Sequence, residues 1–191
     1  MRLALIPGHR PDAPGASAAG FSEYPLARVL CELILQRLPD DLPGFSVQLF
    51  TRPNVGDGLT TLIQDLNAAG VDGALSIHFN ATAEGAPSPD CAYSLTYPGA
   101  EKAGKMADTL RRISFAGIPR LPPKGRKDLA ILSDTAFPVA LDEPAYIDRR
   151  GHRLQLLRSI DKLAMSYAGA IQHIHKSGTL SDGKDAPARG G

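Results

Sequence analysis

The chain has 191 residues, of which 43% are hydrophobic and 21% are charged, a composition typical of one globular domain with its own core. Its 21 lysines and arginines nearly balance 20 aspartates and glutamates, so the net charge of +1 gives no indication of nucleic-acid binding. The apolar runs reach only about eight residues, whereas a membrane span needs roughly 20. Two cysteines are too few for a disulfide framework. We therefore expect a single domain without membrane insertion and without a nucleic-acid partner.

The first half of the chain alternates short apolar runs with amphipathic stretches, which predicts strands and helices in turn. Residues 2–6 form an apolar run that ends at Pro7-Gly8, as a buried strand does. A helix is predicted from Ser22, its N-cap, to Leu38, with a buried face of Leu26, Val29, Leu30, Leu33, Ile34 and Leu38. The patterns then predict a strand over 45–50, a helix over 59–69 closed by Gly70, and a strand over 73–77.

The second half continues the alternation. Residues 91–96 alternate like a strand near a sheet edge, a helix is predicted over about 101–114, and 129–132 and 138–141 are two more short apolar runs. The last helix is predicted over about 151–175, with a buried face of Leu156, Leu157, Ile160, Leu163, Ala164, Tyr167 and Ile171. This order predicts an α/β fold: one domain with a mostly parallel, twisted sheet of about six strands and helices on both faces.

The composition also sets the expected limits of the domain. The catalytic or binding domain is expected over 1–176, and the Gly-, Ser-, Asp- and Lys-rich segment 177–191 is expected to be a disordered C-terminal tail. The loops at 10–21, 81–90 and 114–128 carry no core pattern of their own. Long irregular segments inside a compact domain tend to be functional.

Polar side chains that could bind a metal or act in catalysis follow several of the predicted strands. His9 follows the strand at 2–6, and His78 follows the strand at 73–77. Glu143 follows the run at 138–141, while Glu23 begins the first long helix. Ligands of parallel sheets bind beyond the carboxyl ends of the strands, so these side chains are expected at one edge. Two imidazoles and a carboxylate match the His₂Glu set of catalytic zinc sites, which would leave Glu143 to handle protons.

Each of these residues also has an ordinary structural interpretation. A histidine at a strand end often bonds to a backbone carbonyl rather than to a metal. Glu23, in a first helical turn, would also complement the helix dipole, and Glu143 could be a solvated loop carboxylate. From position alone, the metal site and these alternatives stay open.

The other candidate residues give weaker signals. His173 and His175 are two residues apart and point to different sides of a helix, and His152 is expected to be exposed. Cys31 lies among apolar residues and is expected to be buried. The basic segment 124–127 is either a solvated loop or a contact for an anionic substrate.

Five motifs occur in a specific order along the chain: Pro7-Gly8-His9, Glu23 at a helix start, Thr51-Arg52, Leu75-Ser76-Ile77-His78-Phe79-Asn80-Ala81 and Glu143-Pro144-Ala145-Tyr146-Ile147-Asp148. In these motifs the chain resembles the zinc-dependent N-acetylmuramoyl-L-alanine amidases, a cell-wall amidase family that includes many phage endolysins. The resemblance covers roughly residues 2–172, nearly the whole expected domain.

The resemblance implies roles for individual residues. It implies one Zn²⁺ ion held by His9, Glu23 and His78, and a catalytic role for Glu143. Asn80, two residues after His78, is a candidate substrate-binding residue.

The chain departs from the family pattern at three places. The family often has Gly where Ala145 stands and Asn where Arg149 stands. After the first histidine it usually has a glycine-rich run, whereas this chain has Arg10-Pro11-Asp12. None of these positions is an implied ligand, but they leave the shape of the cleft open.

The implied activity is hydrolysis of the amide that joins N-acetylmuramic acid to the L-alanine of the peptidoglycan stem peptide. Three alternatives are a zinc peptidase acting within the stem, a catalytically inactive wall-binding module, and a domain whose histidines are structural. The chain runs from Met1 almost directly into the apolar run, so we expect synthesis in the cytoplasm without a signal peptide and action on the cell wall after holin-type release. No apolar stripe suggests a dimer seam, so a monomer is favoured.

Overall fold

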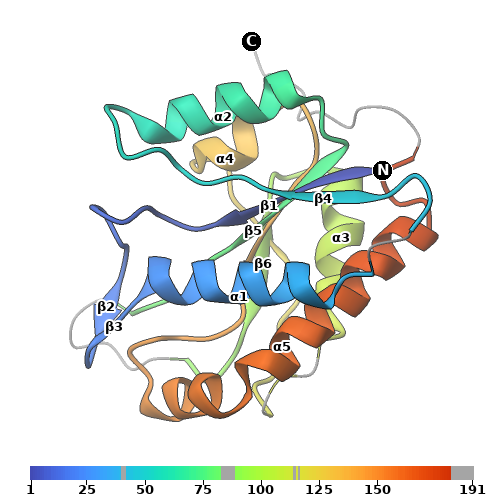
Figure 1. Ribbon diagram of the computed structural model, residues 1–191. Helices are drawn as coiled ribbons and strands as arrows, with labels where there is room; N and C mark the ends of the chain where they lie inside the picture. The colour runs from blue at the N-terminus through green and yellow to red at the C-terminus, as the bar shows by residue number, and fades with distance from the viewer. Residues whose placement is uncertain (40–41, 83–88, 114, 116, 182–191) are drawn as a thin grey trace.

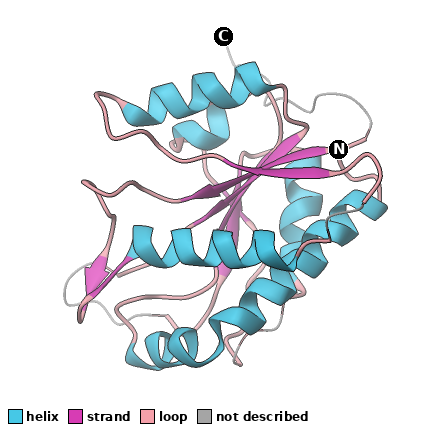
Figure 2. Cartoon of the chain, in the orientation of Figure 1, coloured by secondary structure: helices cyan, strands magenta, loops and turns pink. Residues whose placement is uncertain are grey.

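The computed structural model describes residues 1–39, 42–82, 89–113, 115 and 117–181. Strands and helices alternate along the chain much as the apolar pattern predicts (Figures 1 and 2). Their order is β1 (Arg2–Pro7), β2 (Ser17–Ala18), β3 (Phe21–Ser22), α1 (Glu23–Arg37), β4 (Ser46–Leu49), α2 (Gly58–Ala69), β5 (Gly73–Ile77), β6 (Tyr93–Thr96), α3 (Glu101–Arg111), β7 (Lys124–Gly125), α4 (Ala130–Ser133), β8 (Val139–Glu143) and α5 (Arg150–Lys176).

Six strands form one sheet in the order β4-β1-β5-β8-β6-β7, and β2 and β3 form a small separate hairpin. The strands β4, β1, β5 and β8 are parallel to one another, while β6 runs antiparallel to β8 and parallel to β7. The predicted mostly parallel α/β sheet of about six strands is therefore confirmed. Among the described residues, no helix has both the length and the apolar character that a membrane span requires.

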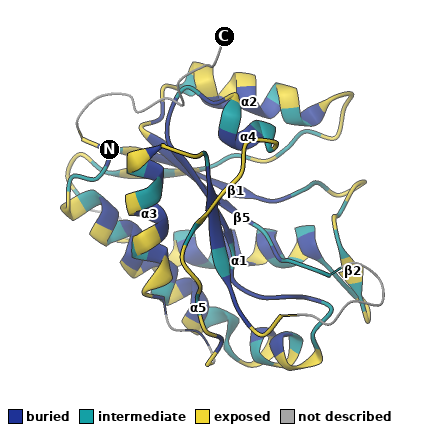
Figure 3. Cartoon of the chain, turned by 180° about the vertical axis from the view of Figure 1, so that it is seen from behind, coloured by how far each residue is buried: buried dark blue, intermediate teal, exposed yellow. Residues whose placement is uncertain are grey.

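Helices cover both faces of the sheet, and each face has its own core. Leu3 and Leu5 of β1 pack into the cluster formed with α1, α3 and α5, whereas Ala4 and Ile6 pack into the cluster formed with α2 and α4. Successive side chains of a strand point to opposite faces, so the apolar run of β1 from Leu3 to Ile6 contributes to both cores. Seen from behind, the central strands are buried along most of their length (Figure 3).

The apolar run at 129–132 does not contribute a strand. It forms the short helix α4, and the sixth strand of the sheet is the two-residue β7 at Lys124–Gly125. A four-residue apolar run has no period that separates a strand from a buried helical turn. The backbone N–H of Leu132 donates to the carbonyl of Leu129, which closes that turn.

Two predicted core positions are instead exposed. Val29 on α1 is 46% exposed and Leu157 on α5 is 62% exposed. Leu157 is one residue from the buried Leu156, about 100° around the helix, and α5 is kinked at Ser159. The apolar stripe predicted for each helix was therefore too wide.

The expected tail lies partly outside the described residues, which end at Ser181. Helix α5 ends at Lys176, close to the expected boundary. Beyond it, Leu180 is buried at 5% exposure and belongs to the core cluster under α1 and α5. Of the expected functional loops, residues 83–88, 114 and 116 also lie outside the described part of the chain.

Candidate metal centre

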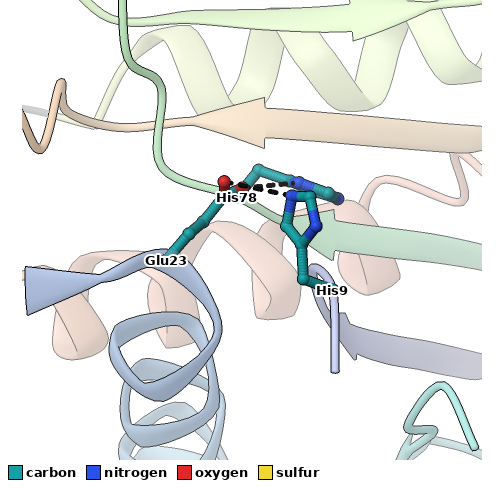
Figure 4. Close-up of side chains that lie close together, drawn as sticks. All are labelled: His9, Glu23 and His78. Atoms are coloured by element: carbon teal, nitrogen blue, oxygen red, sulfur yellow. Dashed lines mark hydrogen bonds and ion pairs between the residues drawn. The ribbon is translucent and has the colours of Figure 1, made fainter. Parts of the chain in front are cut away.

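The structure brings together His9, Glu23 and His78 from three separate elements (Figure 4). His9 and His78 follow the neighbouring parallel strands β1 and β5, and Glu23 is the first residue of α1. His9 Nε2 lies 3.0 Å from Glu23 Oε2, and His78 Nδ1 lies 2.8 Å from Glu23 Oε1. One nitrogen or oxygen of each residue lies within 4.8 Å of those of the other two, so the three side chains could share one ion.

Two glycines make room for this cluster. A Cβ atom at Gly8 would lie 2.5 Å from the ring of His78, and a Cβ atom at Gly15 would lie 2.6 Å from Glu23 Oε2. His9 itself has a φ of 67°, a left-handed conformation that directs its ring back towards Glu23. The backbone around the two histidines is thus shaped to fit their rings.

Glu23 is buried at 5% exposure and is held by the backbone as well as by the histidines. The N–H of Phe79 donates to its Oε1 and the N–H of Ala16 donates to its Oε2, each at 3.2 Å. Burial raises the pKa of Glu23, but hydrogen bonds and charge from His78 and His9 outweigh it and lower the pKa to about 2. A carboxylate kept ionised between two imidazoles is a donor set that fits a divalent metal such as zinc.

The hairpin before α1 places Glu23. Ser22 occupies the predicted N-cap position, but its side chain does not cap the helix. Its hydroxyl instead bonds to that of Ser17 at 2.9 Å, across the β2–β3 pair. The N–H of Glu23 donates to the carbonyl of Ala16, so the hairpin and the helix start are joined directly at the ligand.

Glu143 ends β8, next to the strand that leads to His78, and lies opposite Tyr93 of β6. Its Oε2 is buried and has no hydrogen-bond partner among the described residues. Burial, followed by the negative charges of Glu23 and Asp142, raises the pKa of Glu143 to about 8, and the charge of Arg126 opposes this only partly. A carboxyl group that titrates near neutral pH can both accept and release a proton.

A buried ionic network next to Glu143 was not predicted from the sequence. Asp142 is fully buried and accepts hydrogen bonds from Ser94, Arg120 and Tyr167, while its carbonyl accepts from the N–H of His78 at 2.9 Å. The network therefore fixes the two strand ends that carry His78 and Glu143. In the sequence, Asp142 looks like the polar end of an apolar run, and its partners lie 22 to 48 residues away.

Asn80 links β5 to the loop after β8. Its backbone N–H donates to Ala145 and its carbonyl accepts from Ile147, at 2.9 and 2.8 Å. Its side-chain amide donates to the hydroxyl of Tyr93, and its Oδ1 accepts from the N–H of Ala81. These bonds place Asn80 beside the residue opposite Glu143; substrate binding by Asn80 stays a prediction.

The prediction that His152 is exposed is wrong, because this side chain is 3% exposed. Its Nδ1 accepts from the N–H of Tyr146 at 2.9 Å, and its Nε2 lies 2.9 Å from Asp90. The contacts come from segments distant in sequence, which helix position alone does not reveal. Cys31 is buried, as predicted.

The basic segment 124–127 lies beside the site. Lys124 Nζ is 4.1 Å from the ring centroid of Tyr93, which is opposite Glu143. Arg126 is close enough for its charge to oppose the raised pKa of Glu143. The segment is thus near the predicted centre, as an anion-contacting role would require.

No family model and no curated protein matches this sequence. Solved structures do match its fold. The CwlD amidase of Clostridioides difficile, solved in complex with the GerS lipoprotein, is 17% identical with a TM-score of 0.78, and the match covers 92% of this chain and 98% of that one. The catalytic domain of the N-acetylmuramoyl-L-alanine amidase CwlV from Bacillus (Paenibacillus) polymyxa var. colistinus is 16% identical with a TM-score of 0.75, covering 93% and 98%.

A third similar structure is the catalytic domain of an endolysin that targets Clostridia difficile. It is 18% identical with a TM-score of 0.65, and the match covers 91% of this chain and 97% of that domain. The chain therefore has the fold of N-acetylmuramoyl-L-alanine amidases over nearly its whole length. The resemblance drawn from the five motifs is confirmed at the level of the fold.

Proposed function

We propose that the protein is a zinc-dependent N-acetylmuramoyl-L-alanine amidase that hydrolyses the amide between N-acetylmuramic acid and the L-alanine of the peptidoglycan stem. The observation that carries this proposal is the cluster of His9, Glu23 and His78 beside the half-buried Glu143, whose pKa is raised to about 8. The fold, shared with solved amidases and an endolysin catalytic domain, supports it.

His9, Glu23 and His78 would hold one Zn²⁺ ion. When bound there, zinc would lower the pKa of a water ligand to about 7 and polarise the amide carbonyl. Glu23 is fixed by two backbone N–H groups, so the ligand set is oriented before any substrate arrives. This rigidity favours a catalytic centre over a loose surface site.

Glu143 would act as the proton carrier. Its buried Oε2 would accept a proton from the attacking water and deliver it to the amine nitrogen as the amide bond breaks. The raised pKa suits this exchange, because a group that titrates near neutral pH gains and loses a proton with little free-energy difference. Loss of such a group lowers a rate by a factor on the order of 10² or more.

The proposal extends to the domain limits, the oligomeric state and the site of action. The catalytic domain would comprise residues 1–176, act as a monomer on peptidoglycan and reach the wall after holin-type release. The match to an endolysin catalytic domain supports a role on the wall.

The test combines a metal assay with a digest of purified peptidoglycan. The wild-type protein should bind one zinc per chain and release intact stem peptides that begin at L-alanine, as seen by mass spectrometry. Glu143→Gln should keep the zinc and lose activity by a factor on the order of 10² or more. His78→Ala should lose the zinc, whereas the control His173→Ala, an exposed histidine on α5, should keep both zinc and activity.

Two outcomes would contradict the proposal. Shortened stem peptides would indicate a peptidase instead of an amidase. Full zinc occupancy in His78→Ala would remove that residue from the ligand set.

A further inference from the structure

Two tyrosines lie next to Glu143, at the edge of the sheet that carries the candidate metal centre. Tyr93 of β6 is directly opposite Glu143 of β8 in an antiparallel pair. Residues opposite each other in such a pair project from the same face of the sheet, with Cβ atoms about 4.5–5.5 Å apart. The hydroxyl of Tyr146, three residues after Glu143, donates to the hydroxyl of Tyr93 at 3.5 Å. A pair of phenols therefore lies beside the proposed proton carrier.

The hydrogen bonds that Tyr93 accepts leave its own proton unused. Asn80 Nδ2 donates to the hydroxyl oxygen of Tyr93, and this direction is fixed because Asn80 Oδ1 accepts from the N–H of Ala81 at 2.8 Å. The same oxygen accepts from Tyr146, so both of its lone pairs are engaged. Among the described residues, none accepts the proton of Tyr93, and Glu143 Oε2 has no partner there either. Tyr93 is thus an oriented donor that is available to a ligand.

Tyr146 retains the proton that it shares with Tyr93. Burial, followed by the hydrogen bond with Tyr93, raises the pKa of the Tyr146 hydroxyl above its ordinary value of 10.0. The hydroxyl of Tyr146 is therefore protonated at neutral pH, and it continues to donate to Tyr93. This bond and the one from Asn80 fix the orientation of the Tyr93 hydroxyl before a substrate arrives.

The charges around Tyr93 favour a negatively charged ligand atom. Lys124 Nζ lies 4.1 Å from the centroid of the Tyr93 ring. Arg126 is close enough to interact electrostatically with both Tyr93 and Glu143, and its guanidinium donates to Asp128 at 2.7 and 2.6 Å. These two cations and one anion leave a net positive charge near the Tyr93 hydroxyl, which favours negative charge that develops there.

We propose that Tyr93 is a catalytic residue whose hydroxyl donates a hydrogen bond to the acyl oxygen of the scissile amide as that oxygen becomes negatively charged. The inference rests on the amidase function proposed above and adds a donor for the oxyanion. When water attacks, its oxygen bonds to the carbonyl carbon, its proton passes to Glu143, and the carbonyl π electrons move to the acyl oxygen. Tyr93 donates to this oxygen and keeps its proton. The π bond then re-forms, the C–N bond breaks, and Glu143 gives its proton to the amine.

The proposed bond should act mainly on the rate of the chemical step. A neutral amide carbonyl is a weaker acceptor than an oxyanion, so the bond from Tyr93 strengthens as the reaction proceeds. An interaction that is stronger in the transition state than in the ground state raises kcat with little effect on substrate binding. Removal of one such donor lowers kcat by about 10²–10³-fold in enzymes that form an oxyanion.

The kinetic test uses the zinc-loaded protein and a synthetic N-acetylmuramoyl peptide. Tyr93→Phe keeps the ring and removes the hydroxyl, so kcat should fall on the order of 10²-fold at unchanged KM and zinc content. Tyr146→Phe leaves the proton of Tyr93 in place and should lower kcat by only about 2–10-fold. The control Tyr97→Phe removes the hydroxyl of a half-buried tyrosine just beyond the other end of β6 and should keep the wild-type kcat.

An equilibrium measurement tests the same bond without turnover. A substrate analogue with a phosphinate in place of the scissile amide carries negative charge at a tetrahedral centre, as the oxyanion does. By calorimetry, Tyr93→Phe should bind the phosphinate about 10–100-fold more weakly than the wild-type protein, the range for a hydrogen bond to a charged group. In the Glu143→Gln background, adding Tyr93→Phe should leave the affinity for the uncleaved amide unchanged.

The outcomes separate this inference from the proposed function. Release of stem peptides by Tyr93→Phe at the wild-type kcat, with unchanged phosphinate affinity, would overturn the role of Tyr93 and leave the amidase intact. A change confined to KM, or a larger loss of kcat in Tyr146→Phe than in Tyr93→Phe, would also overturn that role. No release of stem peptides by the wild-type protein would overturn the amidase function itself.

Discussion

The raised pKa of Glu143 makes a specific prediction about stability in the metal-free protein. Burial and the charges of Glu23 and Asp142 raise this pKa from 4.5 to about 8. Below about pH 4.5 the carboxyl is protonated in both the folded and the unfolded chain, so its contribution is constant. Between about pH 4.5 and 8 the unfolded chain releases the proton while the folded chain keeps it. The stability contributed by the protonated group is therefore lost as the pH rises through this window.

The size of the effect follows from the two pKa values. Each pH unit between them corresponds to about 1.4 kcal/mol, which sets an upper bound of about 5 kcal/mol. Glu143 is only partly exposed, and the water that reaches it screens part of the shift, so we expect about 2–3 kcal/mol. For a chain of this length, that corresponds to a fall in Tm of roughly 5–10 °C.

Glu143→Gln isolates the pH-dependent contribution of Glu143 to stability, because glutamine has the shape of the protonated acid but does not titrate. Thermal unfolding in EDTA at about pH 5 and about pH 8 should show a larger loss of stability in the wild-type protein than in the variant. The two proteins differ at this one side chain, so the contributions of all other groups cancel in the comparison. Equal losses in the two proteins would refute the raised pKa. Added zinc should shrink the difference, because a nearby cation favours the ionised carboxylate.

Two further predictions concern the support of the site. Gly8→Ala places a Cβ atom 2.5 Å from the ring of His78, so the affinity for zinc should fall by about 10-fold or more. The control Gly151→Ala adds a Cβ atom in open space on α5 and should leave the affinity unchanged. A normal zinc affinity in Gly8→Ala would show that the added Cβ atom does not crowd His78. Tyr167→Phe removes a buried hydrogen-bond donor to Asp142 and should reduce the free energy of unfolding, measured by urea titration, by about 1–3 kcal/mol. An unchanged urea midpoint of unfolding would show that the hydrogen bond between Tyr167 and Asp142 does not contribute to stability.

The parts of the fold predicted correctly are those with strong local signals. The strands predicted over 2–6 and 73–77 are dense apolar runs, and the corresponding β1 and β5 are neighbours in a parallel sheet. Because their carboxyl ends lie side by side, the residues that follow them meet, which is why His9 and His78 could be paired from sequence. Glu23 was predicted from its place at a helix start, since a helix packed on the sheet begins near this edge.

The parts that sequence reasoning missed depend on distant partners. The role of Arg120 is fixed by Asp142, 22 residues later, and no local pattern connects the two. His152 is buried because Asp90 and the backbone of Tyr146 surround its ring. Strand β7 has two residues and exists only because β6 is beside it. Each of these features depends on tertiary contacts, which the hydrophobic periodicity of the sequence does not predict.

The short strands at the two ends of the sheet bear on how the protein should behave in concentrated solution. β4 offers four residues with exposed Ser46 and Gln48, and β7 offers two. Long flat edges recruit further chains and seed fibrils, whereas brief polar edges give an incoming strand little to pair with. We expect preparations of this protein to tolerate high concentration and long storage without amyloid-like aggregation.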